Sequence, residues 1–293
     1  MAACILWSST FLFIKVGLAE IQPFTFASLR LVIALCVLAP VSARLDSWRS
    51  LTAGDAGVIA SAGVLLLGIN YALLFWGAQF IPSGLVAIIQ SGTPLLALVF
   101  GWGFGLEQPT GRKVAALVLG IAGAIAIFGT EASAAGAAAL AGCLAVFGSS
   151  ASVAFAYVAL KKRGARSSPL MIATLQSASG LIPLAMLAVM VEGRPAAGEW
   201  SIKAWTALLY LALCASVLAF WLNYWLLERM DASAMLMMGV AEVPIAVVLA
   251  AIVLGERLPV GTIAGALCIL TAVVLRLREV GDPRSSPRRA RSG

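Results

Sequence analysis

Long apolar segments separated by short polar ones make up nearly the whole chain. Ten runs are roughly 18 to 26 residues long, the length at which a helix rising 1.5 Å per residue crosses about 30 Å of hydrocarbon. They cover residues 2–19, 24–42, 56–78, 83–104, 112–130, 135–160, 169–191, 203–227, 232–254 and 260–277. Because apolar residues follow one another without alternation, the runs predict helices rather than strands of a closed barrel. The pattern predicts an all-α membrane protein with ten transmembrane helices.

The chain also contains an internal duplication. Residues 83–118 and 233–268 share a plan at a constant offset, in which Ser83, Pro94, Gly105, Pro109, Gly111, Ala116 and Leu117 match Ser233, Pro244, Gly255, Pro259, Gly261, Ala266 and Leu267. Residues 23–30 parallel residues 169–176 in the same way. Five helices per copy is an odd number, so the second copy enters the membrane upside down. We therefore predict two inverted five-helix repeats, 1–131 and 132–278, as in secondary transporters.

The basic residues predict how the chain is oriented. With the N-terminus inside, the cytoplasmic loops and tail hold fifteen of the 20 Lys and Arg residues, whereas the external loops hold only Arg194, Lys203 and Arg257. Such an excess marks the cytoplasmic side, so we expect both termini there. Residues 279–293 are basic and poor in apolar residues, and we expect a disordered tail. Topology and contact with anionic membrane lipid explain the net charge of +7, and nucleic-acid binding is not expected.

Composition argues against several classes of function. Apolar residues make up 61% of the chain and charged residues 11%, which leaves no room for a soluble domain. The chain has no histidine, no acid pair within a span and no metal-ligand spacing, so we expect no enzyme, no metal and no cofactor. It has no Gly-x-x-x-x-Gly-Lys phosphate loop, which disfavours an ATP-driven pump. A channel is also disfavoured, because it would be expected to show a ring of like residues or a symmetric pore.

Several spaced motifs resemble those of a known family. They are Trp7-Ser-Ser-x-Phe with Lys15, Pro23 leading to Ala27-Ser-Leu-Arg30, Glu242-Val-Pro244, Leu254-Gly-Glu-Arg257 and Gly261-x-x-x-Gly265. Together they resemble the ten-helix EamA-type branch of the drug/metabolite transporter superfamily, across essentially the whole chain. The resemblance implies a metabolite exporter of the bacterial inner membrane, similar to aromatic amino acid and threonine/homoserine exporters. One departure is Leu106-Glu107, where the second copy has Glu256-Arg257, and this makes that turn a weak candidate for chemistry.

Two prolines and one acid lie near the middle of their spans. Pro94 and Pro244 remove a helix donor and free the carbonyls of Gln90 and Val240. Their symmetric placement favours hinges that open a central cavity over prolines that only shape packing. Glu242 is the only mid-span acid, which makes it a functional candidate. Its alternatives are a substrate or proton site and a hydrogen-bonded cap of the helix broken at Pro244.

Two basic residues, Lys15 and Arg30, lie in the outer halves of the first two spans. Long basic side chains reach the membrane surface from such positions, so we favour snorkelling or structural pairing. The alternative is a positive rim that attracts a carboxylate, or a gate that pairs with Glu20.

The remaining candidates for a substrate site are polar and aromatic residues at mid-depth. We assign Ser8, Thr10, Asn70, Tyr71, Gln90, Ser149, Ser152 and Trp221 to the lining together with Glu242. For each of them helix packing is an equally good interpretation. The Gly-x-x-x-Gly and Gly-x-x-Gly motifs are interpreted as packing within the bundle rather than as a dimer face, and we expect a monomer.

These observations favour a secondary exporter that works by alternating access, with a cavity between the repeats. Few ionisable groups at mid-depth favour broad specificity for amino acids, including neutral and aromatic ones; amino acids as cargo follow from the resemblance alone. The alternatives are export of another small metabolite, such as a quaternary amine or a nucleoside, and, less favoured, an intramembrane enzyme. A lone mid-span glutamate permits proton exchange without requiring it, so the coupling stays open.

Overall fold

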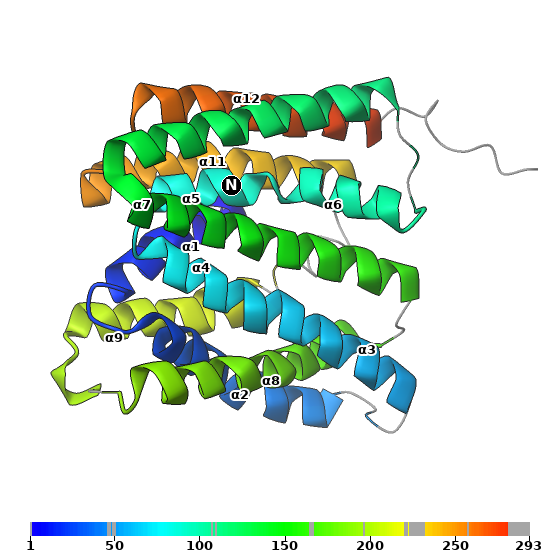
Figure 1. Ribbon diagram of the computed structural model, residues 1–293. Coiled ribbons are helices and arrows are strands. Elements are labelled where there is room, and N and C mark those ends of the chain that lie inside the picture. Colours follow the sequence, from blue (N-terminus) through cyan, green and yellow to red (C-terminus); the bar gives the residue numbers. More distant parts are fainter. Residues whose placement is uncertain are drawn as a thin grey trace, which may run out of the picture.

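A computed structural model describes residues 2–45, 48, 51–106, 108, 110–163, 167–195, 197–219, 222, 232–256 and 258–280 (Figure 1). Every regular element in these ranges is a helix. In chain order they are α1 (Ala2–Gly17), α2 (Pro23–Leu45), α3 (Ala53–Gly63), η2 (Val64–Ile69), α4 (Asn70–Ala78), α5 (Ser83–Ser91), α6 (Thr93–Gly103), α7 (Gly111–Arg163), α8 (Pro169–Leu187), η3 (Ala188–Glu192), η4 (Ala197–Glu199), α9 (Ile202–Leu209), η5 (Tyr210–Leu218), α11 (Ala232–Leu254) and α12 (Val260–Val280).

These helices coincide with the predicted spans. Within the described residues, six segments are long and apolar enough to cross a membrane: Pro23–Leu45, Ala53–Ala78, Ser83–Gly103, Gly111–Thr130, Gly136–Lys162 and Pro169–Glu192. Four shorter apolar helices, Ile5–Gly17, Ile202–Leu218, Glu242–Leu254 and Val260–Leu275, fall in the other four predicted runs. The prediction of an all-α, multi-helix membrane protein is therefore confirmed. The inverted relation between the two halves stays a prediction.

The connection between the fifth and sixth spans differs from the prediction. A loop was expected over residues 131–134, but α7 remains helical there and reverses at Gly136, which has φ 79° and ψ −167°. A positive φ of this size is strained for any residue with a Cβ, and glycine adopts it freely. The two parts of α7 consequently run in opposite directions (Figure 1).

Three spans contain wider helical turns that the apolar pattern does not predict. Residues Val64–Ile69, Ala188–Glu192 and Tyr210–Leu218 form π-helix, in which the hydrogen bonds reach five residues rather than four. The widened turns free some carbonyls for side-chain donors. Asn70 Nδ2, for example, donates to the carbonyl oxygen of Leu66 at 2.9 Å.

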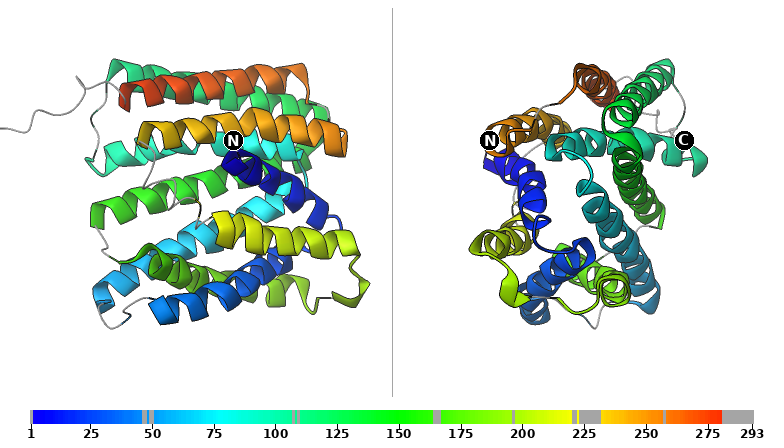
Figure 2. Two further views of the ribbon diagram at one scale, coloured as in Figure 1. Left: turned by 180° about the vertical axis from the view of Figure 1, so that it is seen from behind. Right: turned by 60° about the vertical axis from the view of Figure 1, so that its left-hand side comes forward.

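Small residues let α7 and α12 approach closely. A Cβ added at Gly123 would lie 2.7 Å from the carbonyl oxygen of Gly265, and one added at Gly265 would lie 2.7 Å from that of Gly123. The right-hand view of Figure 2 shows α12 beside the first part of α7 at one edge of the bundle, with α2 and α8 at the opposite edge. These two glycines allow close packing of helices within the bundle, which is the role that the sequence analysis gives to the glycine motifs.

Loops cluster at both ends of the bundle. At one end, on the left in Figure 1, the chain leaves α1, α4, η3 and α11 and enters α2, α5, α9 and α12. We call this the latched end, for the contacts described below; in the predicted topology it is the external face. The opposite end is where α3, α8 and the first part of α7 begin, and it is predicted to be cytoplasmic.

Candidate functional site

A polar cavity of about 370 Å³ lies between α1, α2, η2, α4, α7, α8 and η5. Its size falls in the range of small-molecule sites. Apolar side chains make most of its wall, and the aromatic and polar lining residues are Trp7, Asn70, Tyr71, Tyr157, Gln176, Ser177 and Ser216. Tyr157 lies in the last two turns of α7 and Ala173 in the first two turns of α8, which places the cavity in the half of the bundle opposite the latched end.

The most distinctive group beside this cavity is Arg30. Its side chain is only 4% exposed. Nε donates to Ser216 Oγ at 3.0 Å, Nη2 donates to the Ala215 carbonyl oxygen at 3.3 Å, and the guanidinium carbon lies 4.8 Å from the centre of the Tyr71 ring. All three partners line the cavity. Of the two favoured interpretations, snorkelling or structural pairing, the structure agrees with pairing: hydrogen bonds and stacking hold Arg30 inside the bundle.

Asn70 presents an unused acceptor to the same region. Its Nδ2 is bound to the backbone of the preceding π-helix turn, whereas its Oδ1 is buried and has no hydrogen-bond partner among the described residues. A buried acceptor left without a donor is costly, and a donor brought to Asn70 Oδ1 would offset that cost. Asn70 and Tyr71 are the predicted lining residues that the structure places on the cavity wall.

Three other predicted lining residues lie on contacts between helices. Gln90 Nε2 donates to Ser149 Oγ at 3.1 Å and its Oε1 accepts from Ser150 Oγ at 3.1 Å, which joins α5 to α7. Ser152 Oγ donates to the Leu65 carbonyl oxygen at 2.8 Å and joins α7 to the π-helix turn. These side chains pair with protein groups and stand apart from the cavity wall, so they position helices.

The first span holds two more of the predicted residues. Ser8 is fully buried and its Oγ donates to the Glu242 carbonyl oxygen at 2.9 Å, which ties α1 to α11. Thr10 Oγ1 donates within its own helix, to the Leu6 carbonyl oxygen at 3.3 Å. Glu242 is half-buried at this α1–α11 contact. Trp221 lies outside the described residues.

The two mid-span prolines differ from each other. The span with Pro94 divides at Gly92 into α5 and α6, and Thr93 Oγ1 donates at 2.6 Å to the Gln90 carbonyl that the proline leaves free. The span with Pro244 is a single helix, Ala232–Leu254. A hinge role for either proline stays a prediction, and the break itself is present at Pro94.

Lys15 has a structural partner. Its Nζ donates to the carbonyl oxygens of Ala78, Gln79 and Ile81 at 2.9, 3.2 and 2.8 Å, so it caps the C-terminal end of α4. The alternative in which the rim bases pair with Glu20 is not what the described residues show, because the Glu20 carboxylate binds Ser201. Lys15 and Arg30 therefore both have structural partners, Lys15 at the latched end and Arg30 beside the polar cavity.

The sequence interpretation missed four polar residues of the cavity: Tyr157, Gln176, Ser177 and Ser216. One signal was available, because the duplication aligns Gln176 with Arg30, and both lie at this cavity or against its wall. Within the described residues, no group of three His, Cys, Asp or Glu side chains is placed to hold a metal.

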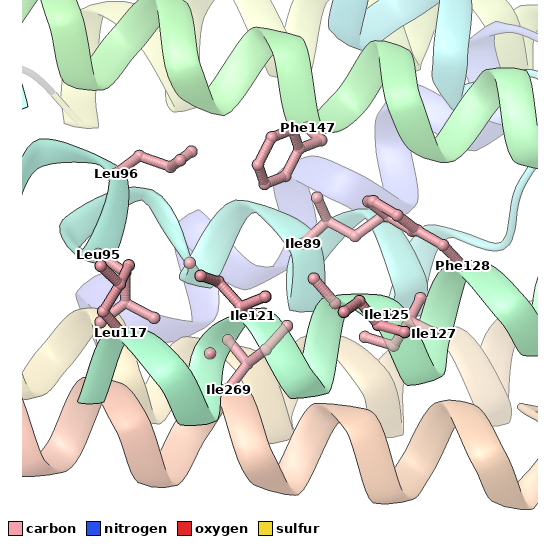
Figure 3. A pocket seen from close by; sticks show the side chains of 13 residues that line it. Ile89, Leu95, Leu96, Leu117, Ile121, Ile125, Ile127, Phe128, Phe147 and Ile269 are labelled. Carbon is pink, nitrogen blue, oxygen red and sulfur yellow. The ribbon is translucent and has the colours of Figure 1, made fainter. Parts of the chain in front are cut away.

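A second cavity, of about 250 Å³, is lined only by apolar side chains and glycines from α5, α6, α7 and α12. Figure 3 shows Ile89, Leu95, Ile121, Phe147 and Ile269 around it. It offers no polar group that could orient a hydrophilic solute. A third cavity, of about 360 Å³, lies between α3, η2, the C-cap of α6 and α7. It has Ser61 and Lys162 in its lining. We take the polar cavity beside Arg30 as the candidate transport site because the buried Arg30 side chain lies against its wall, to which both family-matched segments contribute.

The fold and this cavity define a multi-pass membrane protein with an internal polar site, and comparisons supply the family. The chain belongs to the EamA-like transporter family, whose model matches residues 1–129 and 140–278. "Uncharacterized transporter YvbV" from Bacillus subtilis (strain 168) is 28% identical over 92% of this chain and 88% of its own length. "Probable terminal-alkyne amino-acid exporter" from Streptantibioticus cattleyicolor is 27% identical over 96% and 93%.

A solved crystal structure agrees with this fold. It superposes on 97% of this chain and 96% of its own length, with a TM-score of 0.62 and 19% sequence identity. At that identity the likeness concerns the fold alone. The family membership establishes a transporter in a membrane, which agrees with the resemblance seen in the sequence.

Proposed function

We propose that this transporter exports amino acids across the bacterial inner membrane by alternating access, with both termini in the cytoplasm. The observation that carries the proposal is the buried cation of Arg30 against the wall of a cavity to which Asn70 Oδ1 contributes a buried, unpartnered acceptor. An α-amino acid carries a carboxylate and an ammonium group close together. Arg30 suits the carboxylate, and Asn70 Oδ1 with the Tyr71 face suits the ammonium.

The donor count of Arg30 supports this assignment. A guanidinium has five N–H donors, and two of them are used on Ser216 and Ala215 in the described structure. The remaining donors can bind a carboxylate in the two-pronged geometry that arginine favours. The apolar part of the wall leaves side chains of different size unselected, which supports broad specificity.

The relatives support export of amino acids but do not establish the cargo of this chain. One relative is named as an amino-acid exporter, and its similarity covers nearly the full length of both chains. The two matched family segments, 1–129 and 140–278, fit the proposed pair of inverted repeats with the cavity between them.

The direct test is uptake and counterflow in proteoliposomes of the purified protein. Labelled neutral, aromatic, acidic and basic amino acids are compared, with and without a pH gradient. We expect saturable flux of several neutral amino acids that compete with one another. Absence of flux for all of them would reject amino acids as cargo and direct the screen to quaternary amines and nucleosides.

Variants connect the flux to the cavity. Arg30→Gln and Asn70→Ala should each lower flux at unchanged expression, because each removes one of the two proposed contacts. Thr206→Ala is the matched control: it removes an exposed hydroxyl that donates to the Ile202 carbonyl of its own helix. Equal flux for all three variants would contradict the site. Glu242→Gln, assayed beside them, decides whether flux needs that acid.

A further inference from the structure

Three glutamates at the latched end bind helix starts that are far away in sequence. Glu20 follows α1, and its carboxylate accepts hydrogen bonds from Ser201 N and Ser201 Oγ, both at 2.6 Å. Ser201 is the N-cap of α9. The first free backbone N–H groups of a helix carry partial positive charge, so a carboxylate is well placed there.

The second and third glutamates repeat this arrangement on other helices. Glu192 accepts from Phe24 N at 2.8 Å and Thr25 N at 2.7 Å, in the first turn of α2. Glu256 accepts from Ser83 N at 2.9 Å, Ser83 Oγ at 3.0 Å and Gly84 N at 3.2 Å, at the start of α5. Hydrogen bonds to a charged acceptor are about twice as strong as neutral ones.

All three contacts join the two family-matched segments of the chain. Glu20 lies in the segment 1–129 and binds the segment 140–278, whereas Glu192 and Glu256 lie in 140–278 and bind 1–129. The loops that carry them lie together at one end of the bundle (Figure 1). Lys15, which caps α4 at the same end, interacts electrostatically with Glu256. Charged contacts between the halves therefore concentrate here.

Behind these contacts lies a solid apolar layer. Its largest members are at most 1% exposed, and they are Ile14, Ile21, Phe26, Phe75, Ile81 and Leu85. The Phe26 and Phe75 rings meet edge to face at 5.3 Å. The polar cavity lies on the other side of this layer, toward the opposite end of the bundle. A solute in the cavity can leave through the latched end only if the layer parts.

We propose that Glu20, Glu192 and Glu256 form the gate of this transporter at the latched end. Each carboxylate holds a loop of one half onto a helix start of the other half, and the apolar layer stays closed while the three remain bound. Opening releases them together and exchanges the helix N–H groups for water. The proposal rests on the proposed transport function, and it gives Glu20, Glu192 and Glu256 one shared role that the cavity does not show.

The test measures access to the apolar layer without any cargo. Ala27, 0% exposed in the second turn of α2, is replaced by cysteine in a background without native cysteines. A membrane-impermeant maleimide is added from the latched-end side of oriented vesicles, and the labelling rate is compared with and without the gate substitutions Glu20→Gln, Glu192→Gln and Glu256→Gln. The amide keeps the shape of the side chain but loses its charge and one acceptor.

The control is Glu199→Gln. Glu199 is exposed, lies in η4 at the same end, and makes no such contact between the halves in the described structure. We expect the triple gate variant to be labelled at least about tenfold faster, an opening equilibrium shifted by ~1.4 kcal/mol, and Glu199→Gln to be labelled at the parent rate. Equal rates for the parent and a folded triple variant would overturn the gate.

A pair of milder substitutions tests the gate if the triple variant does not fold. Ser83→Ala and Ser201→Ala each remove one hydroxyl donor from a gate contact and keep the carboxylate. If the triple variant fails to elute as a single species, the Ser83→Ala/Ser201→Ala double variant decides alone, with several-fold faster labelling expected and an unchanged rate counting against the gate. Failure of amino-acid flux would reject the proposed cargo and leave this result standing, because the labelling needs no substrate.

Discussion

At the scale of single residues, Arg30 is a charged side chain buried inside a predicted membrane span. A charged side chain in the hydrocarbon region costs roughly 2.5 to 3.5 kcal/mol on insertion scales. Hydrogen bonds to Ser216 and Ala215 and the Tyr71 ring offset part of that cost. All three partners belong to the cavity wall, so the arrangement holds the cation directly behind that wall.

The geometry of Arg30 predicts that charge alone is insufficient. In Arg30→Lys the ammonium keeps the charge but loses the planar fork that reaches Ser216 and Ala215 while lying over Tyr71. Loss of a desolvated cation–π contact is worth ~1–2 kcal/mol, so we expect about a tenfold drop in counterflow at unchanged expression. Flux equal to the parent would show that any cation suffices at this position.

The Glu20 contact predicts a dependence on pH. Hydrogen bonds from the Ser201 hydroxyl and backbone N–H, with a smaller contribution from Lys203, lower the pKa of Glu20 below its ordinary value. A lowered pKa means that the contact stabilises the fold above the ordinary pKa of a glutamate and is lost as pH falls through the lowered one. The melting temperatures of the parent and Glu20→Gln should therefore differ at neutral pH and converge in acid. A difference that persists unchanged in acid would contradict this.

At the scale of helices, the hydroxyl of Thr93 compensates for the hydrogen bond that is lost at Pro94. Proline has no backbone N–H, so Pro94 cannot donate to the Gln90 carbonyl. The Thr93 hydroxyl donates to that carbonyl instead, at 2.6 Å. Thr93→Val removes that donor at nearly constant volume and should lower stability by about 1–2 kcal/mol. Thr93→Ser keeps the hydroxyl and serves as the control, with melting in detergent as the measurement. A Thr93→Val variant as stable as the parent would contradict this role of the hydroxyl.

At the contact between α7 and α12, we predict opposite effects on stability for two glycine-to-alanine substitutions in α7. A Cβ at Gly123 would lie 2.7 Å from the backbone oxygen of Gly265, so Gly123→Ala must push the helices apart and should destabilise by ~1–3 kcal/mol. A Cβ at Gly129 meets nothing within 4 Å. Gly129→Ala should therefore be neutral or stabilising by up to ~1 kcal/mol, as denaturation in detergent can check.

Much of this helical framework is predictable because long apolar runs leave the chain few choices in a membrane. The spans and their number follow from run length alone. The π-helix turns and the reversal at Gly136 do not, since they depend on how neighbouring helices pack. The same holds for single residues. The depth of Asn70 and Tyr71 in their span was enough to predict that they line a cavity. The inward position of Arg30 could not be predicted, because it depends on the direction in which the side chain points. The Glu192 and Glu256 contacts join residues more than 160 positions apart, beyond any local pattern.

At the scale of the whole molecule, the two ends of the bundle differ. The latched end has three carboxylate contacts between the halves above a buried apolar layer. The opposite end holds the polar cavity and the helix ends that carry Arg112, Lys113, Lys161 and Lys162. In the predicted topology the site is therefore turned toward the cytoplasm, the side from which an exporter collects its cargo.

This asymmetry predicts one-sided access to the site in the absence of cargo. Ala173 lines the cavity near the start of α8, and Ala27 lies in the apolar layer. In a background without native cysteines, Ala173→Cys should react with an impermeant maleimide added from the cytoplasmic side and resist the same reagent from outside, while Ala27→Cys resists both. A saturating transported solute should slow the Ala173→Cys reaction, because it occupies the cavity and shifts the conformational equilibrium. Labelling of Ala173→Cys from the outside first would contradict either the predicted topology or the position of the gate. The sidedness of a cysteine placed at exposed Glu199, in η4 at the latched end, would tell the two apart.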